Sequence, residues 1–178
     1  MNPTILPYKG IYPQIHETAF IAPNATIIGD VVIGEYSSVW PGCVIRGDVN
    51  IIRIGKRTNI QDGTIIHVTR PSIAGEGGQT IIGDNITVGH SATIHACTLE
   101  DECFVGMSAT ILDGAIVKKG AMLAAGALLT PKKQVLGCQI WAGNPAKYMR
   151  DMTDGEKAFI MISAENYVND AKAHKESY

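Results

Sequence analysis

Aliphatic residues recur at every sixth position along most of this chain, and this is the strongest pattern in the sequence. A period of six fits neither an amphipathic helix nor the simple alternation of a strand. It is typical of a short strand plus a turn, with three repeats closing each triangular coil of a parallel β-helix. The twenty repeats therefore predict an all-β fold of about six to seven coils. They begin at Ile15, Ile21, Ile27, Ile33, Val39, Ile45, Ile54, Ile60, Ile66, Ile82, Val88, Ile94, Leu99, Val105, Ile111, Val117, Leu123, Leu129, Val135 and Trp141.

The C-terminal part of the chain loses the period of six. We therefore expect a hexapeptide-repeat β-helix domain over 1–150 and a C-terminal segment over 151–178. Thr153 and Glu156 have the spacing of a capping box, which marks the start of a helix. The sequence predicts a helix over about 154–173. Its packing against the outside of the β-helix is assigned to Phe159, Ile162 and Tyr167 or their neighbours.

The repeats can be assigned in turn to three faces of the prism if two interruptions are allowed. The first is a three-residue insertion between Ile45 and Ile54, and the second is a protruding loop over 72–81. The GEGG run at 75–78 in this loop lacks the Lys-Ser/Thr of a phosphate-binding loop. We interpret it as a source of loop flexibility.

This assignment places the candidate chemistry in two columns on different faces. Successive coils are about 4.8 Å apart, so equivalent positions stack directly above one another. The first column is Arg46, His67 and His95, each following the aliphatic residue of the third face, and the second is Asp62 and His90. One chain does not aim both columns at one point. Two neighbouring chains of a cyclic trimer do, where the third face of one meets the second face of the next.

Composition and charge narrow the remaining classes of function. The 178 residues carry a net charge of −2 with a pI of about 6.2, which gives no electrostatic case for binding nucleic acid or an anionic membrane. The longest apolar run, 121–129, is too short to span a bilayer as a helix. The N-terminus does not resemble a signal peptide. Four cysteines without CxxC spacing indicate reduced thiols, so a cytoplasmic location is expected.

The three histidines of the two columns favour a metal site. Three neutral imidazoles suit Zn²⁺ with a fourth position open to water, and such a site lowers the pKa of the bound water to about 7. Fe²⁺ and Co²⁺ are alternatives. The competing interpretation is that His67, His90 and His95 are unrelated surface histidines. Three of the chain's five histidines lie at this level and two share a column, which favours the metal.

Three segments of the sequence resemble the γ-class carbonic anhydrase family, in particular its short bacterial members. They are VIRGDVNIIRIG (44–55), NIQDGTIIHV (59–68) and TVGHSATIHAC (87–97). The resemblance implies a left-handed β-helix, a homotrimer and CO₂ or bicarbonate as substrate. It also implies that zinc is bound by His67 and His95 of one subunit and His90 of its neighbour.

The same resemblance assigns roles to other site residues. Arg46 and Asp48 resemble the family's arginine–carboxylate pair at the subunit boundary, and Asp62 resembles the acid that pairs with that arginine across the interface. Gln61 resembles the residue that hydrogen-bonds the zinc-bound water, with Asn59 as its polar support. A purely structural ion network is the alternative for Arg46, Asp48 and Asp62. Tyr167 resembles a tyrosine near the site, although helix packing is its alternative role.

The chain departs from the most active members where they carry proton-transfer glutamates. Val49 and, approximately, Arg70 stand there, and Glu76 is a weak substitute. Hydration of CO₂ by zinc hydroxide needs a proton relay, so we expect weak activity. Three alternatives stay open: an acyltransferase using acyl-coenzyme A, a zinc-dependent thioesterase, and a non-catalytic metal-bound trimeric scaffold. Cys97 is expected to be a buried thiol rather than a ligand.

Overall fold

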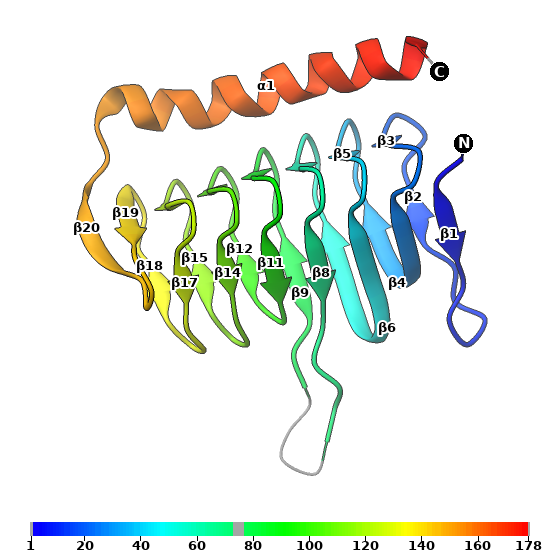
Figure 1. Cartoon of the computed structure of the whole chain (residues 1–178), viewed down its shortest axis with the longest axis horizontal. Helices are drawn as coiled ribbons and strands as arrows, with labels where there is room; N and C mark the ends of the chain where they lie inside the picture. The colour runs from blue at the N-terminus through cyan, green and yellow to red at the C-terminus, as the bar shows by residue number, and fades with distance from the viewer. Residues whose placement is uncertain (1, 73–76, 178) are drawn as a thin grey trace.

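The computed structural model describes residues 2–72 and 77–177, which form a parallel β-solenoid with a helix along one side (Figure 1). The expected loop over 72–81 lies partly outside these residues, and Glu76 lies wholly outside them. The elements are β1 Thr4–Leu6, β2 Gln14–Ile15, β3 Phe20–Ile21, β4 Thr26–Ile33, β5 Ser38–Val39, β6 Val44–Ile54, β7 Asn59–Ile60, β8 Ile65–His67, β9 Thr80–Ile82, β10 Thr87–Val88, β11 Thr93–His95, β12 Thr98–Leu99, β13 Phe104–Val105, β14 Thr110–Ile111, β15 Ile116–Val117, β16 Met122–Leu123, β17 Leu128–Leu129, β18 Gln134–Val135, β19 Gln139–Ala142, β20 Lys147–Asp151 and α1 Asp154–Ser177.

The strands stack in the three faces that the period of six predicts. One face follows the order β3-β5-β7-β10-β13-β16-β19, which corresponds to about seven turns. The pairings are parallel except at the end, where β20 runs antiparallel to β19. The predicted insertion is confirmed, because β4 and β6 pair with a register shift between Gly29 and Val31. Long β6 therefore continues across two faces and pairs with both β8 and β9.

The interior of the prism is filled by the aliphatic residue of each repeat. On the face that carries the histidine column, the inward side chains are fully buried, and each contributes about 1.5–3 kcal/mol by leaving water. Most of these side chains are β-branched, and β-branched residues favour the extended backbone of a strand. Neighbouring side chains on a strand then point outward, which presents the polar columns to solvent. The buried column is Ile27, Ile45, Ile66, Ile94, Ile111 and Leu129.

Helix α1 begins with the predicted capping box. The Thr153 backbone N–H donates to Glu156 Oε2 at 2.9 Å, and the Glu156 N–H donates to Thr153 Oγ1 at 3.3 Å. The helix extends to Ser177, beyond the predicted end near 173. No helix among residues 2–72 and 77–177 combines the length and apolar character needed to cross a membrane.

Two of the three residues assigned to the packing face are exposed, and their neighbours Ile160 and Ser163 are buried instead. Phe159 is 47% exposed and Ile162 is 54% exposed, although the Phe159 ring lies 5.9 Å from that of Phe104. The helix packs against the face formed by β3, β5, β7 and β10. Half-buried Tyr167 does pack, edge-on against Trp40. The buried stripe of the helix is Ile160, Ser163, Ala164, Val168 and Ala171.

Candidate metal centre

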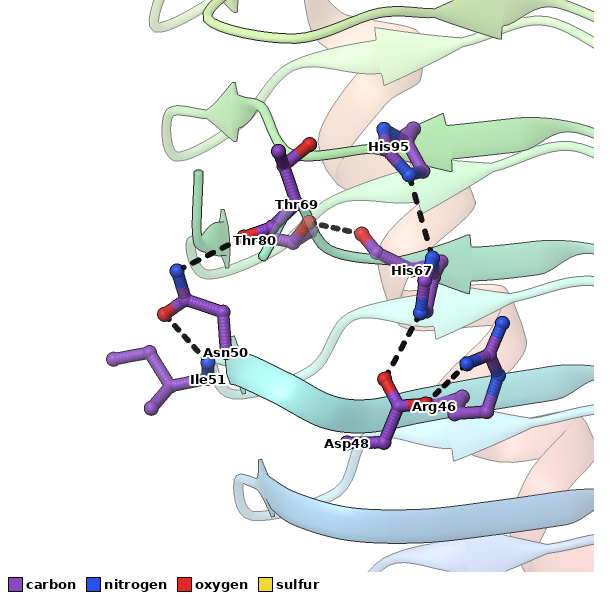
Figure 2. A network of polar contacts seen from close by, with 8 residues as sticks. All are labelled: Arg46, Asp48, Asn50, Ile51, His67, Thr69, Thr80 and His95. Carbon is purple, nitrogen blue, oxygen red and sulfur yellow. Dashed lines mark hydrogen bonds and ion pairs between the residues drawn. The ribbon is translucent and has the colours of Figure 1, made fainter. Parts of the chain in front are cut away.

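His67 and His95 stand on successive coils, directly above one another. The register pairs His95 of β11 with His67 of β8, and Ile45 with Ile66, which places Arg46 one coil before His67. The predicted column is therefore confirmed. In Figure 2, His67 lies between His95 and Asp48, with Arg46 beyond the carboxylate.

Two imidazole nitrogens face each other in this column. Nδ1 of His67 lies 3.3 Å from Nε2 of His95. The outer nitrogens contact carboxylates: His67 Nε2 lies 3.0 Å from Asp48 Oδ1, and His95 Nδ1 lies 2.7 Å from Asp113 Oδ1. A neutral imidazole has one N–H, and an ionised carboxylate only accepts. If both outer nitrogens donate, two lone pairs face each other, and this arrangement calls for a cation between them.

The pair also has the spacing that zinc requires. Two nitrogen ligands of a tetrahedral Zn²⁺, with bonds of about 2.0–2.1 Å, lie about 3.3 Å apart. The carboxylates behind His67 and His95 are the partners that metal-binding histidines commonly use, because they fix the tautomer and the ring orientation. The donor set of these residues therefore fits zinc.

Both carboxylates are poised to accept hydrogen bonds at neutral pH. Partial burial raises the pKa of Asp48, but hydrogen bonds from His67 and Arg46 outweigh it and hold the pKa below its ordinary value. Burial likewise raises the pKa of Asp113, and hydrogen bonds from Thr69 and His95 lower it further than burial raises it. Each carboxylate is therefore ionised where its histidine needs an acceptor.

Asp113 is absent from the sequence-based site. It follows Ile111 by two residues, whereas the histidines follow their aliphatic residue by one, so a search of equivalent positions passes over it. The turn after β14 brings it to His95, and Thr69 Oγ1 contacts its second oxygen. The signal in the sequence that could have pointed to Asp113 is that it follows its aliphatic residue by two positions, as Asp62 does.

The Arg46–Asp48 pair is supported by tight backbone packing. Arg46 Nη1 donates to Asp48 Oδ2, and its guanidinium is half-exposed. A Cβ added at Gly47 would lie 2.5 Å from the Asp30 carbonyl oxygen, so the RGD glycine allows β4 and β6 to approach. The end of β8 is fixed as well, because Thr80 Oγ1 donates to the His67 carbonyl oxygen at 2.7 Å (Figure 2).

The second column stands on another face. His90 Nδ1 lies 2.9 Å from Asp62 Oδ2, and both side chains are about half-exposed. When Nδ1 donates to the carboxylate, Nε2 keeps a lone pair. Within residues 2–72 and 77–177, no three His, Cys, Asp or Glu side chains form a group that could hold a metal ion. One chain thus presents a pair of histidines in one place and a single histidine in another.

Gln61 and Asn59 form a buried amide network beside the second column. Gln61 Nε2 donates to Asn59 Oδ1 at 3.0 Å, and Asn59 Nδ2 donates to Thr87 Oγ1 at 2.9 Å. Thr87 Oγ1 in turn lies 2.8 Å from Ser163 Oγ on α1. These contacts hold the Gln61 side chain in place. Because its Nε2 donates to Asn59, its Oε1 is left to accept a hydrogen bond.

Burial raises the pKa values of Tyr167 and of the Cys97 thiol. Burial raises the pKa of the Tyr167 phenol, and the carboxylates of Asp62 and Asp170 add to the rise. Its packing against Trp40 gives it a structural role. Cys97 is buried, as predicted, and burial raises the pKa of its thiol to about 12.

The residues at the places of the expected glutamates offer no carboxylate. Val49 is partly buried and packs against the core. Arg70 is exposed at the rim of a cavity of about 690 Å³, which Asp113 and Lys132 also line. Valine and arginine side chains carry no hydrogen-bond acceptor, so neither can replace the glutamate of a relay.

Comparisons with known proteins agree with the fold and with the family that the sequence resembles. Residues 12–47 match the family described as bacterial transferase hexapeptide (six repeats). The chain is 54% identical over 162 residues to gamma carbonic anhydrase 2, mitochondrial, of Arabidopsis thaliana, covering 91% of this chain and 58% of that protein. It is 40% identical over 171 residues to a carbonic anhydrase of Geobacillus kaustophilus, covering 96% of this chain and 91% of that protein.

A solved structure of a hexapeptide transferase family protein from Anaplasma phagocytophilum superposes with a TM-score of 0.90 at 47% identity. The match covers 96% of this chain and 97% of that one. The chain spans about three fifths of the length of the plant relatives it matches. The Geobacillus relative, by contrast, matches over nearly the full length of both chains, so the predicted family resemblance of this chain is confirmed. The chain belongs to the γ-class carbonic anhydrase-like family of hexapeptide-repeat proteins.

Proposed function

We propose that this chain is a zinc-dependent carbonic anhydrase, a lyase that interconverts CO₂ and bicarbonate as a cyclic homotrimer. The observation that carries the proposal is the pair of facing nitrogens of His67 and His95, each ring held by a carboxylate. The third ligand in this proposal is His90 of the partner subunit, because the two columns of one chain stand on different faces. Relatives named carbonic anhydrase, at 40% and 54% identity, support the assignment.

The chemistry would be divided between the metal and the protein. Bound Zn²⁺ lowers the pKa of a coordinated water and supplies hydroxide at neutral pH. Fe²⁺ and Co²⁺ also suit imidazole ligands. Gln61 is held by Asn59 and would orient water or substrate through its Oε1. Arg46 uses one donor on Asp48 and keeps others for the bicarbonate anion, which a half-exposed guanidinium can reach.

Proton removal would limit turnover. Val49 and Arg70 provide no relay, and the raised pKa of Tyr167 keeps its phenol protonated near neutral pH. Tyr167 would then assist only as a hydrogen-bond donor. Asp62 holds His90 in this scheme and, as the family resemblance implies, would pair with an arginine across the interface. We also propose a cytoplasmic location, since Cys43, Cys97 and Cys103 are free thiols.

The test combines metal analysis of the purified protein with a CO₂ hydration assay. Wild type is expected to carry about one zinc per chain, because each interface of a cyclic trimer holds one site. His90→Ala is expected to lose both zinc and hydration. His16→Ala is the matched control, because the His16 ring contacts Thr18 in its own loop and approaches Glu35, away from both columns. Equal zinc content in wild type and His90→Ala would contradict the proposal.

Sedimentation and substrate assays separate the alternatives. A sedimentation mass near three chains of 19.0 kDa is expected, and a monomer would contradict the shared site. Acyl transfer is the second candidate, favoured by the transferase name of the Anaplasma structure. A metal-free protein that acetylates small amines would replace the first assignment. A zinc-loaded protein without hydration would favour the thioesterase or the scaffold.

A further inference from the structure

The turn after β14 is fastened to the turn that follows His95. The Gly114 N–H donates to the Ala96 carbonyl oxygen at 2.7 Å, which holds the neighbouring Asp113 in place above His95. Asp113 Oδ1 then lies 2.7 Å from His95 Nδ1. The carboxylate therefore comes from the next coil, on a turn that backbone contacts hold in place.

We propose that Asp113, oriented by Thr69, is a positioning residue that fixes the tautomer of His95 and aims its Nε2 at the metal. The inference rests on the proposed function, since it names what prepares one ligand of that site. Nothing in the repeat pattern or the matching relatives' names assigns this role.

The tautomer argument follows from counting protons. Neutral His95 has one N–H, and the carboxylate at Nδ1 offers only acceptors, so the proton sits on Nδ1 and Nε2 keeps its lone pair. That lone pair faces His67 Nδ1 at 3.3 Å. Without Asp113 the proton can occupy Nε2, which then points an N–H at the metal position and cannot bind.

Thr69 orients the Asp113 carboxylate. Its Oγ1 contacts Asp113 Oδ2, so the two carboxylate oxygens are divided between Thr69 and His95. This division matters because the Asp113 side chain is about half-exposed and would otherwise rotate freely.

The backbone of Thr69 is itself held in place by Gly78. The Thr69 backbone pairs with Gly78 through bonds of 2.9 and 3.2 Å. A Cβ on Gly78 would lie 2.7 Å from Ala96 Cβ, so this glycine permits the loop to close against the turn beside His95. The glycine run interpreted as a source of flexibility thus includes a packing requirement.

The first measurement uses metal-free protein with ¹⁵N-labelled histidine and reads the His95 tautomer by NMR. Wild type is expected to show the Nδ1–H form, and Asp113→Ala the Nε2–H form as the majority. Asp113→Asn keeps an acceptor oxygen and is expected to retain Nδ1–H. Asp101→Ala is the control, an aspartate-to-alanine change at a turn where the Oδ1 bonds only the Asp84 N–H. An unchanged Nδ1–H form in Asp113→Ala would overturn the inference.

The second measurement is zinc affinity by competition with a chelator. Asp113→Ala is expected to weaken zinc by about 10–100-fold, the usual effect of losing a carboxylate behind a ligating histidine. Asp113→Asn and Thr69→Val are expected to fall between it and wild type. Wild-type affinity in both Asp113 variants would overturn the inference while leaving the zinc site intact. A wild type that binds no zinc would instead contradict the proposed function, and the metal-free tautomer would still decide the role of Asp113.

Discussion

The two histidine columns of this chain are prepared to different degrees. His67 and His95 face each other on adjacent strands, and the side chain of His67 is only 22% exposed. His90 lies on another face, with 45% of its side chain exposed and its Nδ1 in contact with the similarly exposed carboxylate of Asp62. In the proposed site, one column supplies two ligands that already face each other within one chain. The other column would supply a single ligand to the site of a neighbouring chain.

The largest effect should come from breaking the preformed pair. His67→Ala leaves His95 and His90 as single ligands on separate chains, whereas His90→Ala leaves the pair intact. Apparent zinc affinities of about 10–16 kcal/mol are shared among three or four ligands, so His90→Ala should weaken zinc by about 10²–10⁴-fold. His67→Ala should weaken it further. Chelator competition measures both, and weaker binding in His90→Ala than in His67→Ala would invert the comparison.

A smaller effect should come from removing the carboxylate behind each column. Asp48 is 13% exposed and is held by two partners, whereas Asp62 is 48% exposed with one. Asp48→Asn should therefore weaken zinc by about 10–100-fold, and Asp62→Asn by less. Metal titration of the two variants, with Asp101→Asn as the control, checks this order. Equal losses of zinc affinity in the two variants would show that the burial of a carboxylate does not decide how much it contributes to zinc binding.

Acid should act on the preformed half even without metal. The pKa of Asp48 lies below its ordinary value of 3.8 in the folded chain, so the folded state binds this proton less readily than the unfolded one. Its contribution to stability is complete above about pH 4 and is lost as pH falls through the lower folded-state pKa. Urea unfolding of metal-free wild type should show this loss. Asp48→Asn should be less stable at pH 7 and should lack that part of the acid dependence, so parallel pH curves for the two proteins would contradict it.

The smallest effect should come from the hydroxyl of Tyr167. Its ring packs 5.5 Å from Trp40, so Tyr167→Phe should preserve stability to within about 0.5 kcal/mol. Tyr167→Ala removes the packing. It should cost less than the about 3–5 kcal/mol of a fully buried aromatic ring, because half of this ring is already in contact with solvent. Hydration rates of Tyr167→Phe decide its role in the site. A fall of more than about tenfold without a loss of stability would place the phenol in the chemistry.

The sequence was sufficient for the solenoid and both columns because each rests on counting positions. A six-residue period sets the register, and the register stacks His95 on His67 as predicted. Asp113 could not be found this way, since a turn rather than a strand carries it to His95. The helix face was predicted only to within a residue, because hydrophobicity favoured Phe159 and Ile162. The neighbouring Ile160 and Ser163 are the residues that are buried.

The divided site can be tested most directly by mixing two inactive variants. His67→Ala lacks half of the pair, and His90→Ala lacks the single ligand, so neither homotrimer should hold zinc tightly. In mixed trimers, an interface that joins the intact pair of one chain to the intact His90 of the other is complete. Random mixing in equal amounts makes about one quarter of the interfaces complete. We predict that zinc content and hydration return to about that fraction of wild type. Mixed trimers, verified by native mass spectrometry, that regain neither would contradict a site shared between subunits.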